Sequence, residues 1–270
     1  MKAGVIVYGF NRPGQLSNTL ESLKKQGAQN IVASINVPTD EANKEKNAKC
    51  IEVAEKYADV VRIMDKPMNL NIHILGGMKF MVENYDRFIY LDDDCFPTSS
   101  AWEIFNKDLD EIEDNDKIFS RYGHYFLCPS EFNNKAITRF QGWGWATTSK
   151  KMAEFIPDLE KILAMNGSKD PNKTLSSPKY KKFVNKHLSK EINQKLNITL
   201  TRNCVGTIRL APYWDGTLCL LTALKNKLHQ KTTKRVIYNC GSGGIHFKQI
   251  ARKPPYNMID PSEVWDYYDK

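Results

Sequence analysis

The chain has 270 residues and a formal net charge of +8, with 41% hydrophobic and 26% charged residues. This ordinary globular composition excludes a disordered or fibrous chain, and no run of eighteen apolar residues is present to cross a membrane. The six cysteines are scattered without a Cys-x-x-Cys pair, which argues against a zinc ribbon or a dense disulfide framework, and the N-terminus enters an apolar strand without a secretory signal. We therefore expect a cytoplasmic protein.

The first half of the chain alternates short apolar runs with amphipathic stretches. Apolar runs rich in β-branched residues predict strands at 4–10, 30–36, 60–64 and 87–91, and helical periodicity predicts helices at 15–25, 40–57 and 74–84. This alternation predicts an α/β fold with a mostly parallel, Rossmann-like sheet and helices on both faces. Ligands of such sheets bind beyond the carboxyl ends of the strands.

The alternation weakens after residue 120. The sequence then predicts a strand at 122–128, a helix at 150–164, a helix following Tyr213, a strand at 235–239 and a Gly-rich loop at 240–246. We expect residues 1–120 and 121–270 to form two halves of one domain, with the second half smaller in its regular structure.

Charge is distributed unevenly along the chain. Residues 101–120 hold seven acidic and two basic residues, whereas residues 161–200 hold nine lysines and two acidic residues. The basic segment 179–190 has two readings: an amphipathic helix that lies on an anionic membrane, or a helix whose charged face is simply solvated. The excess positive charge indicates an anionic partner without identifying it.

Three consecutive carboxylates follow the fourth predicted strand, at Asp92, Asp93 and Asp94. Because side chains alternate along a strand, we expect Asp92 and Asp94 to point one way and Asp93 the other. Adjacent carboxylates repel, so something positive is expected beside them, and a divalent Mg²⁺ or Mn²⁺ ion suits an all-oxygen site. The alternative is a solvated turn before a helix, for which residues 100–103 read as a capping box.

Several short motifs occur in a fixed order along the chain. They are Phe10-Asn-Arg-Pro13, Asn69-Leu-Asn71, Tyr90-Leu-Asp-Asp-Asp-Cys-Phe-Pro97, Gly142-Trp-Gly-Trp-Ala-Thr147 and Gly241-Ser-Gly-Gly-Ile-His246. Together they resemble the GT-A fold glycosyltransferases. Within that fold, the sequence is most similar to bacterial polysaccharide sugar transferases that are distantly related to the mannosyl-glycoprotein N-acetylglucosaminyltransferases.

This resemblance implies a nucleotide-sugar site in residues 1–120 and an acceptor side in residues 121–270. It implies that Asp94 binds Mn²⁺ or Mg²⁺. The donor nucleotide would be contacted by the remaining residues of the site, which are Arg12, Asn36, Asn69, Asp92 and Asp93. Of these, Arg12 has a guanidinium suited to a bidentate phosphate contact, Asn36 is expected at the base edge, and Asp93 is expected near the ribose.

The resemblance also implies functional residues in the second half. Asp215 would be the general base, with Asp108 and Glu131 as weaker candidates, although an Asp before a helix also serves as an N-cap. Trp143 and Trp145 would contact the sugar or acceptor, although tryptophan is also common in protein cores. His246 would bind the metal or a phosphate, and one extra residue in its Gly-rich loop leaves a structural histidine as the alternative.

Together these predictions describe a metal-dependent glycosyltransferase that moves a sugar, most simply from a UDP-sugar and with inversion, to a hydroxyl of a glycan or a lipid-linked acceptor. The alternative enzyme is a Mg²⁺-dependent nucleotidyltransferase, which uses acids and a parallel sheet in a similar way. A basic nucleic-acid-binding protein is the non-enzyme alternative. It is disfavoured because aromatic residues are not interleaved with the lysine-rich stretch, and no nucleic-acid partner is expected.

Overall fold

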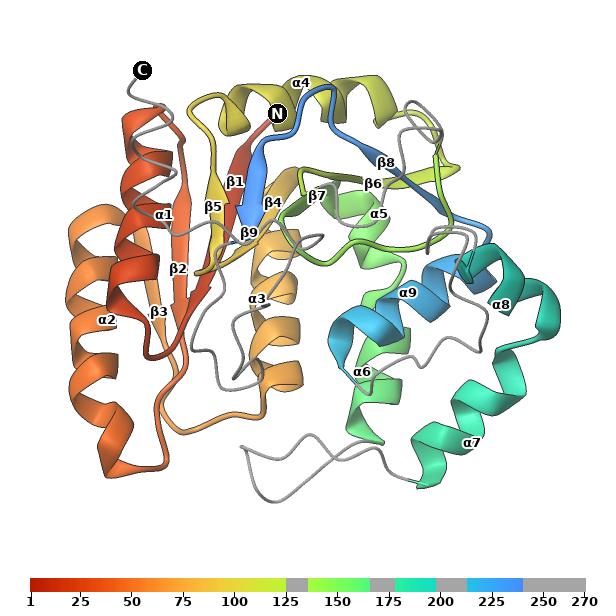
Figure 1. Cartoon of the computed structure of the whole chain (residues 1–270), viewed down its shortest axis with the longest axis horizontal. Helices are drawn as coiled ribbons and strands as arrows, with labels where there is room; N and C mark the ends of the chain where they lie inside the picture. The colour runs from red at the N-terminus through yellow and green to blue at the C-terminus, as the bar shows by residue number, and fades with distance from the viewer. Residues whose placement is uncertain (125–135, 166–177, 198–212, 240–270) are drawn as a thin grey trace, which may run out of the picture.

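The computed structural model describes residues 1–124, 136–165, 178–197 and 213–239, apart from the side chains at 193, 195 and 197. A seven-stranded sheet, ordered β3-β2-β1-β4-β7-β6-β8, runs through the middle of the molecule (Figure 1). The sheet begins with β1 (Ala3–Gly9), β2 (Ile31–Ile35), β3 (Val60–Ile63) and β4 (Arg87–Asp92), which are all parallel. These strands confirm the four predicted for the first half.

The second half extends the same sheet with β7 (Trp145–Thr148), β6 (Ile118–Tyr122) and β8 (Leu228–Lys231). β7 is antiparallel to both β4 and β6, and β8 is parallel to β6. Only β7 therefore runs against the common direction of this sheet, and the predicted mostly parallel α/β fold is confirmed.

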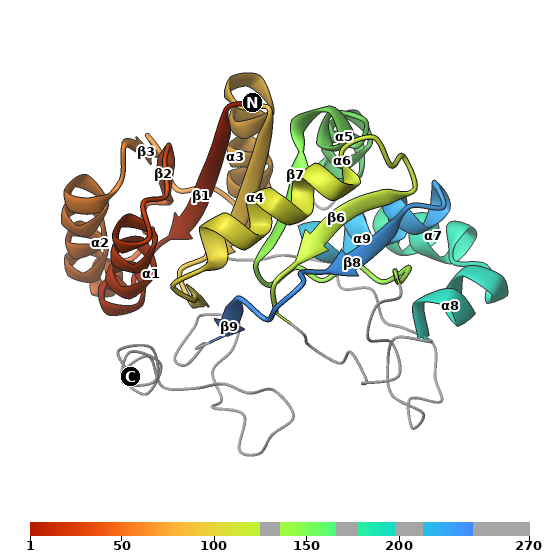
Figure 2. The same cartoon turned by 90° about the horizontal axis from the view of Figure 1, so that it is seen from above.

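Helices cover both faces of the sheet (Figure 2). Val5 and Val7 of β1 pack toward α1 (Pro13–Lys25), α2 (Lys44–Tyr57) and α4 (Ala101–Ile112). Ile6 and Tyr8 point to the other face, which carries α3 (Leu70–Asn84), α5 (Ser149–Ala153), α6 (Ile156–Ala164) and α9 (Trp214–Leu224). The alternation of a central strand thus divides the hydrophobic core into two layers.

Two further helices lie in the lysine-rich stretch, α7 (Pro178–His187) and α8 (Lys190–Asn197), and a short 3₁₀ helix, η1 (Glu41–Asn43), precedes α2. A separate antiparallel pair joins β5 (Cys95–Pro97) to β9 (Ile237–Asn239). Asn239, the last described residue, is paired with Cys95. The residue that follows the acid triplet is therefore bound to the C-terminal part of the described chain.

Three expectations about the elements need correction. The strand predicted at 122–128 begins too late, because β6 covers Ile118–Tyr122 and its polar Ser120 and Arg121, which are buried with partners, interrupt the apolar pattern. Residues 125–128 of the predicted strand lie outside the described residues. The helix predicted at 150–164 is two helices, since Pro157 has no backbone N–H and sits at the start of α6.

The capping box predicted at 100–103 is also absent. Ser100 does precede α4, but its side chain makes no capping hydrogen bond. None of the helices that the structure describes is both long and apolar enough to cross a membrane.

Candidate functional site

The carboxyl ends of the first, second and fourth strands lie side by side. Tyr8 of β1 is in register with Ser34 of β2 and with Asp92 of β4. The loops that leave these three strands therefore begin at one edge of the sheet, where the predicted site residues Arg12, Asn36 and Asp92 are found. This arrangement is the one expected for ligand binding in a parallel sheet.

A tight turn gives the three carboxylates different surroundings. The strand β4 ends at Asp92 and β5 starts at Cys95, so Asp93 and Asp94 form the turn between them. Asp92 accepts a hydrogen bond of 2.8 Å from the hydroxyl of Tyr90. The turn is fixed from α1, because the hydroxyl of Thr19 donates to the backbone oxygen of Asp93 at 2.9 Å.

Arg12, at the start of α1, is the positive group beside these acids. Its Nε donates to Asp93 Oδ2 at 3.1 Å, a second nitrogen contacts Asp93 Oδ1, and its Nη1 donates to Asp94 Oδ2 at 2.8 Å. Asp92 and Asp93 thus diverge as predicted, but Asp94 contributes to both sides: one oxygen faces Arg12 and the other faces Asp92 and Cys95. Arg12 here pairs with carboxylates, and its contact with a phosphate stays a prediction.

One guanidinium does not balance three carboxylates. Burial, together with the negative charge of Asp94, raises the pKa of Asp92 to about 8. A raised pKa of this origin means that the ionised carboxylate is disfavoured by both desolvation and repulsion. A cation between Asp92 and Asp94 relieves both effects.

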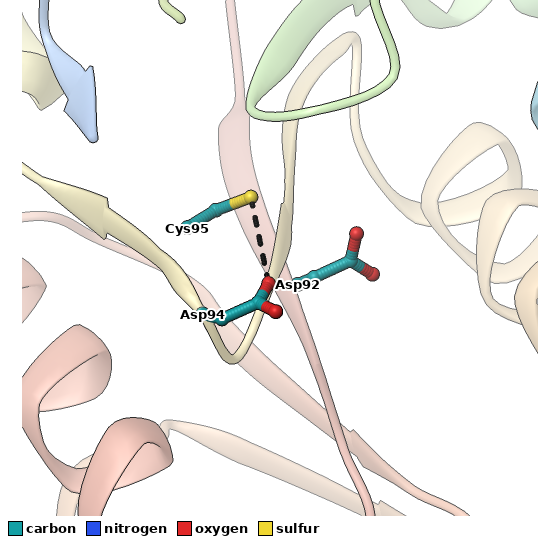
Figure 3. Close-up of side chains that lie close together, drawn as sticks. All are labelled: Asp92, Asp94 and Cys95. Atoms are coloured by element: carbon teal, nitrogen blue, oxygen red, sulfur yellow. Dashed lines mark hydrogen bonds between the residues drawn. The ribbon is translucent and has the colours of Figure 1, made fainter. Parts of the chain in front are cut away.

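The residues present fit a hard divalent ion. Ligand atoms of Asp92, Asp94 and Cys95 lie within 4.8 Å of one another (Figure 3). Burial raises the pKa of the Cys95 thiol well above its ordinary value, so this sulfur stays protonated and is a poor ligand. The two carboxylates remain, and Mg²⁺ or Mn²⁺ is typically held by one or two carboxylates with phosphate oxygens and water.

Amide side chains fix the loops around this edge. The Asn36 amide donates to the backbone oxygen of Met68 at 2.8 Å and accepts from the backbone nitrogen of Met68 at 3.0 Å. Asn47 of α2 donates to the backbone oxygens of Phe10 and Asn36, at 2.6 and 2.7 Å. Asn36 thus joins two loops, and its predicted contact with a base remains untested. Asn47 was missed, although an amide on the buried face of an amphipathic helix is a signal for such a role.

Two asparagines connect α3 to the rest of the site. Asn69 caps this helix, because its side chain accepts from the backbone nitrogen of Asn71 at 3.0 Å. Asn71 is buried and accepts from the backbone nitrogen of Trp214 at 2.9 Å, which fixes the start of α9. The structure therefore gives Asn69 a capping role, and its predicted contact with the nucleotide is not tested.

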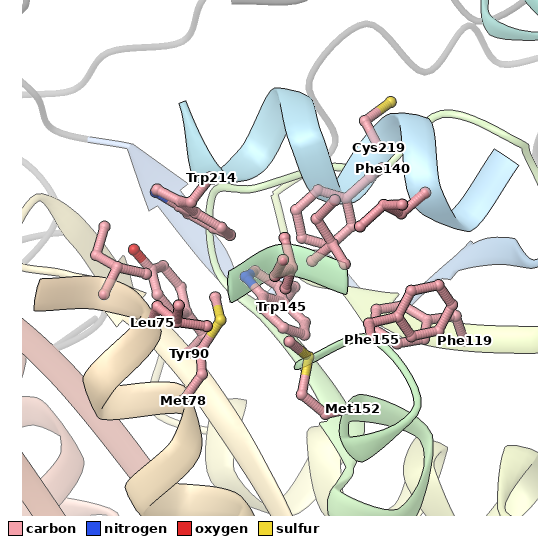
Figure 4. Packing of buried hydrophobic residues seen from close by; sticks show 14 of the residues in the cluster. Leu75, Met78, Tyr90, Phe119, Phe140, Trp145, Met152, Phe155, Trp214 and Cys219 are labelled. Atoms are coloured by element: carbon pink, nitrogen blue, oxygen red, sulfur yellow. The ribbon is translucent and has the colours of Figure 1, made fainter. Parts of the chain in front are cut away.

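An aromatic cluster joins the acid turn to α9. The ring of Tyr90, whose hydroxyl bonds Asp92, lies 4.7 Å from the ring of Trp214 and 5.5 Å from that of Trp145 (Figure 4). Trp145 is fully buried, and Phe88, Phe119 and Phe140 also surround it. This burial favours the alternative reading of Trp145 as a core residue, and its predicted contact with a sugar is not tested. Trp143 is only half-buried and stays a candidate.

Asp215 stands in the first turn of α9, next to Trp214. The N-cap of this helix is Tyr213, so the alternative reading of Asp215 as an N-cap is not supported. Its Oδ1 accepts from the backbone nitrogen of Gly216 at 2.8 Å, and burial raises the pKa of the carboxyl. A carboxyl with a raised pKa is suited to accept a proton, and the aromatic cluster connects its helix to Asp92.

Of the remaining predicted site residues, the structure describes Asp108. Asp108, on α4, accepts from the backbone nitrogen of Thr233 at 2.7 Å and is fully buried, which indicates a structural role. Glu131, His246 and the Gly-rich loop at 240–246 lie outside the described residues.

Comparisons with known proteins address the fold. No protein-family model matches the chain, and no curated protein is similar to it in sequence. Among solved structures, S. aureus TarS 1–349 in complex with UDP-GlcNAc matches 93% of this chain and 62% of its own, with a TM-score of 0.51 and 13% identity.

Two other matches are more distant in shape. The mannosyltransferase PcManGT of Pyrobaculum calidifontis, in complex with GDP-Man and Mn²⁺, covers 83% of this chain and 73% of its own, with a TM-score of 0.43 and 11% identity. A cytidylyltransferase of Leptospira borgpetersenii covers 69% and 73%, with a TM-score of 0.39 and 16% identity. The match to TarS carries the conclusion that the resemblance seen in the motifs extends to the fold: the chain has a GT-A-type α/β fold.

Proposed function

We propose that the protein is a metal-dependent glycosyltransferase that uses a nucleotide-sugar donor, most simply a UDP-sugar. The observation that carries this proposal is the acid turn at the carboxyl end of β4, where carboxylate oxygens of Asp92 and Asp94 lie within 4.8 Å of each other and burial and mutual repulsion disfavour their negative charges. The fold is consistent with it, and TarS, which has a similar fold, was solved with UDP-GlcNAc.

Asp92 and Asp94 would hold Mn²⁺ or Mg²⁺ at this turn. When bound, such an ion stabilises the negative charge that gathers on a diphosphate leaving group. Arg12 keeps the turn in place through Asp93 and Asp94, and its guanidinium lies beside the carboxylates that would hold the metal. Asn36 and Asn69 order the loops beside this region.

Asp215 would act as the general base. It would accept the proton of an acceptor hydroxyl as that oxygen attacks the anomeric carbon, which gives inversion at that carbon. Residues 1–120 would then bind the donor and residues 121–270 the acceptor, with the half-buried Trp143 as a sugar contact. The acceptor would be a glycan or a lipid-linked glycan, and the lysine-rich α7 would hold the protein at an anionic membrane surface.

The decisive experiment is calorimetric titration of UDP, GDP, CDP and ADP, with and without Mn²⁺, into the wild-type protein, Asp94→Ala and Asp114→Ala. Asp114 is the matched control, because it is exposed and lies between α4 and β6, at the opposite edge of the sheet. We expect one nucleotide to bind with metal, and Asp94→Ala to weaken that binding by about tenfold or more while Asp114→Ala does not.

Three other outcomes would count against the proposal. Metal-dependent binding that survives in Asp94→Ala removes the assignment of the metal site. Absence of nucleotide binding in every condition leaves the acid turn as a structural feature. Release of pyrophosphate from a nucleoside triphosphate and a sugar phosphate would identify a nucleotidyltransferase instead.

A further inference from the structure

The guanidinium of Arg139 is unusual among the charged groups of the described residues. Within the described part of the chain its guanidinium makes neither a hydrogen bond nor an ion pair, and its Nη1 is buried. An unpaired N–H of a charged group costs more when it is buried than a neutral one does. Such a group is therefore either a defect of packing or half of a contact with a ligand.

The backbone on both sides of Arg139 is firmly held. Ile137 exchanges two backbone hydrogen bonds of 2.7 Å with His229. Phe140 is buried, with its ring 5.0 Å from the ring of Trp145 and 6.0 Å from that of Trp214 (Figure 4). Arg139 is thus fixed beside α9 by its neighbours in sequence and not by any contact of its own guanidinium.

The charge of Arg139 acts on the carboxyl group of Asp215. The positive charge of Arg139 opposes the burial that raises the pKa of Asp215, yet no ion pair joins the two side chains. The chain also passes close to α9 just after Arg139, because a Cβ at Gly142 would lie 3.3 Å from Cβ of Asp215. The guanidinium of Arg139 and the proposed base Asp215 therefore lie in the same region without forming an ion pair.

The surroundings of this region favour negative charge in a ligand. α9 begins here, and the positive end of its dipole receives no side-chain cap from Tyr213. α7 packs alongside, since the Tyr180 hydroxyl lies 3.4 Å from Thr217 Oγ1. The exposed face of α7 carries Lys179, Lys181, Lys182 and Lys186.

We propose that Arg139 binds an anionic group, a phosphate or a carboxylate, carried by the acceptor next to the hydroxyl that reacts at Asp215. That the ligand is an acceptor rests on the proposed function; the existence of the anion site does not. This site differs from the one for the donor diphosphate, because Arg12 packs with α1 on one face of the sheet and Arg139 lies beside α9 on the other. The acceptor is accordingly an acidic glycan or a phosphate-bearing lipid-linked glycan, and not a neutral sugar.

The test is titration of inorganic phosphate into the wild-type protein, Arg139→Gln and Lys150→Gln, in the presence and absence of saturating UDP and Mn²⁺. Lys150→Gln is the matched control, because it removes one positive charge from an exposed position on α5. We expect phosphate to bind the wild-type protein and Lys150→Gln, and to bind Arg139→Gln about tenfold or more weakly, which is the size expected for hydrogen bonds to a charged group. UDP should bind all three equally and should leave the phosphate site free.

Two results overturn the inference. Equal phosphate binding by all three proteins, or none by the wild type, removes Arg139 as an anion site. Phosphate binding that UDP abolishes places the anion in the donor diphosphate site. If UDP binds none of the proteins but phosphate binding still requires Arg139, the anion site stands and the proposed glycosyltransferase function fails by itself.

The stability of Arg139→Gln separates a structural role from a binding role. A guanidinium that holds α9 by an ion pair with Asp215 in solution would make this variant less stable than Lys150→Gln in urea. We expect the two variants to be equally stable, because within the described residues no hydrogen bond or ion pair of the Arg139 guanidinium would be lost.

Discussion

At the residue scale, Asp215 offers a sharp test of the proposed chemistry because asparagine preserves nearly everything except the basic oxygen. Asn keeps the shape and can still accept the 2.8 Å hydrogen bond from the backbone nitrogen of Gly216. We expect Asp215→Asn to bind the donor nucleotide as the wild type does and to lose about 10²- to 10⁴-fold in the rate of sugar transfer, the usual contribution of a general base.

Release of nucleoside diphosphate from the nucleotide sugar, with water or a glycan as acceptor, is the measurement for Asp215→Asn. The matched control is Asp114→Asn, which makes the same change at an exposed turn. Transfer at the wild-type rate would remove Asp215 as the base and leave its raised pKa as a consequence of burial alone.

The candidate site also shows how far single residues can be read from the sequence. The acid triplet was predicted to lie where ligands of a parallel sheet bind, because the end of a parallel strand fixes where its next residues go. For Trp145 the sequence left both a sugar contact and a core position open, since a motif does not reveal which face of β7 is buried. Arg139 was missed because the absence of a partner is visible only when the neighbours are in place.

At the element scale, a buried lysine joins the end of α4 to the start of β6. Lys151 Nζ donates to the backbone oxygens of Ile112, Asn115 and Ile118, the last two at 3.1 and 2.7 Å. A cation at the C-terminal end of a helix also interacts favourably with its dipole. We expect Lys151→Met to leave these carbonyls without donors and to lower the free energy of unfolding by about 3 kcal/mol.

Urea denaturation compares this variant with Lys150→Met, in which the neighbouring lysine is exposed. We expect the control to change the free energy of unfolding by no more than about 0.5 kcal/mol. Equal losses in both variants would mean that Lys151 contributes only as part of α5 and not through the three carbonyls.

A second buried group ties β6, β8 and α9 together and should make stability depend on pH. His229 is fully buried between Ser120 Oγ at 2.8 Å and Thr222 Oγ1 at 3.1 Å, and burial lowers its pKa to about 3. In the unfolded chain His229 has an ordinary pKa of about 6.5, so it binds a proton at a pH at which it stays neutral in the folded protein. The contribution of His229 is thus complete above pH ~6.5 and declines as the pH falls toward 3.

For this histidine we expect about 2 kcal/mol of stability to be lost between pH 8 and pH 5. Urea denaturation gives the free energy of unfolding at both pH values. In His229→Gln the decrease of this free energy from pH 8 to pH 5 should be smaller than in the wild type by about 2 kcal/mol, independently of how much the substitution lowers stability at pH 8. His187→Gln, at a half-buried position on α7, is the control that removes an imidazole outside this cluster. An unchanged pH dependence in His229→Gln would show that His229 binds its proton as readily in the folded protein as in the unfolded chain.

Elements were predictable where each was apolar and local, and less so where polar side chains are buried. The four strands of the first half were identified to within about a residue or two at most ends because their runs are continuous. β8 was missed because it reads Leu-His-Gln-Lys, and its His229 is buried only through partners on β6 and α9. β5 was missed because three residues gain strand structure only from pairing with β9.

At the scale of the whole molecule, the helix α7 presents exposed lysines at one end of the protein. α7 and α2 lie at opposite ends of the protein (Figure 1). On α7, Tyr180 and Val184 are buried while the lysines at 179, 181, 182 and 186 are exposed. Because the apolar side of α7 already packs in the core, contact with a membrane would be electrostatic and not by insertion. We therefore expect binding to vesicles that contain anionic lipid, none to vesicles of neutral lipid, and loss of binding in high salt.

Sedimentation with vesicles tests which lysines are responsible. Changing Lys179, Lys182 and Lys186 together to Gln should weaken binding by about a hundredfold, since each lysine near an anionic surface contributes about 1 kcal/mol. Changing Lys44, Lys46 and Lys56 of α2, which are also exposed, alters the net charge equally and serves as the control. If both triple variants weaken binding to the same extent, the attraction comes from net charge and α7 has no special place in it. If only the α7 variant does so, α7 is the surface that faces the membrane, and because it packs against α9 it brings Asp215 close to a lipid-linked acceptor.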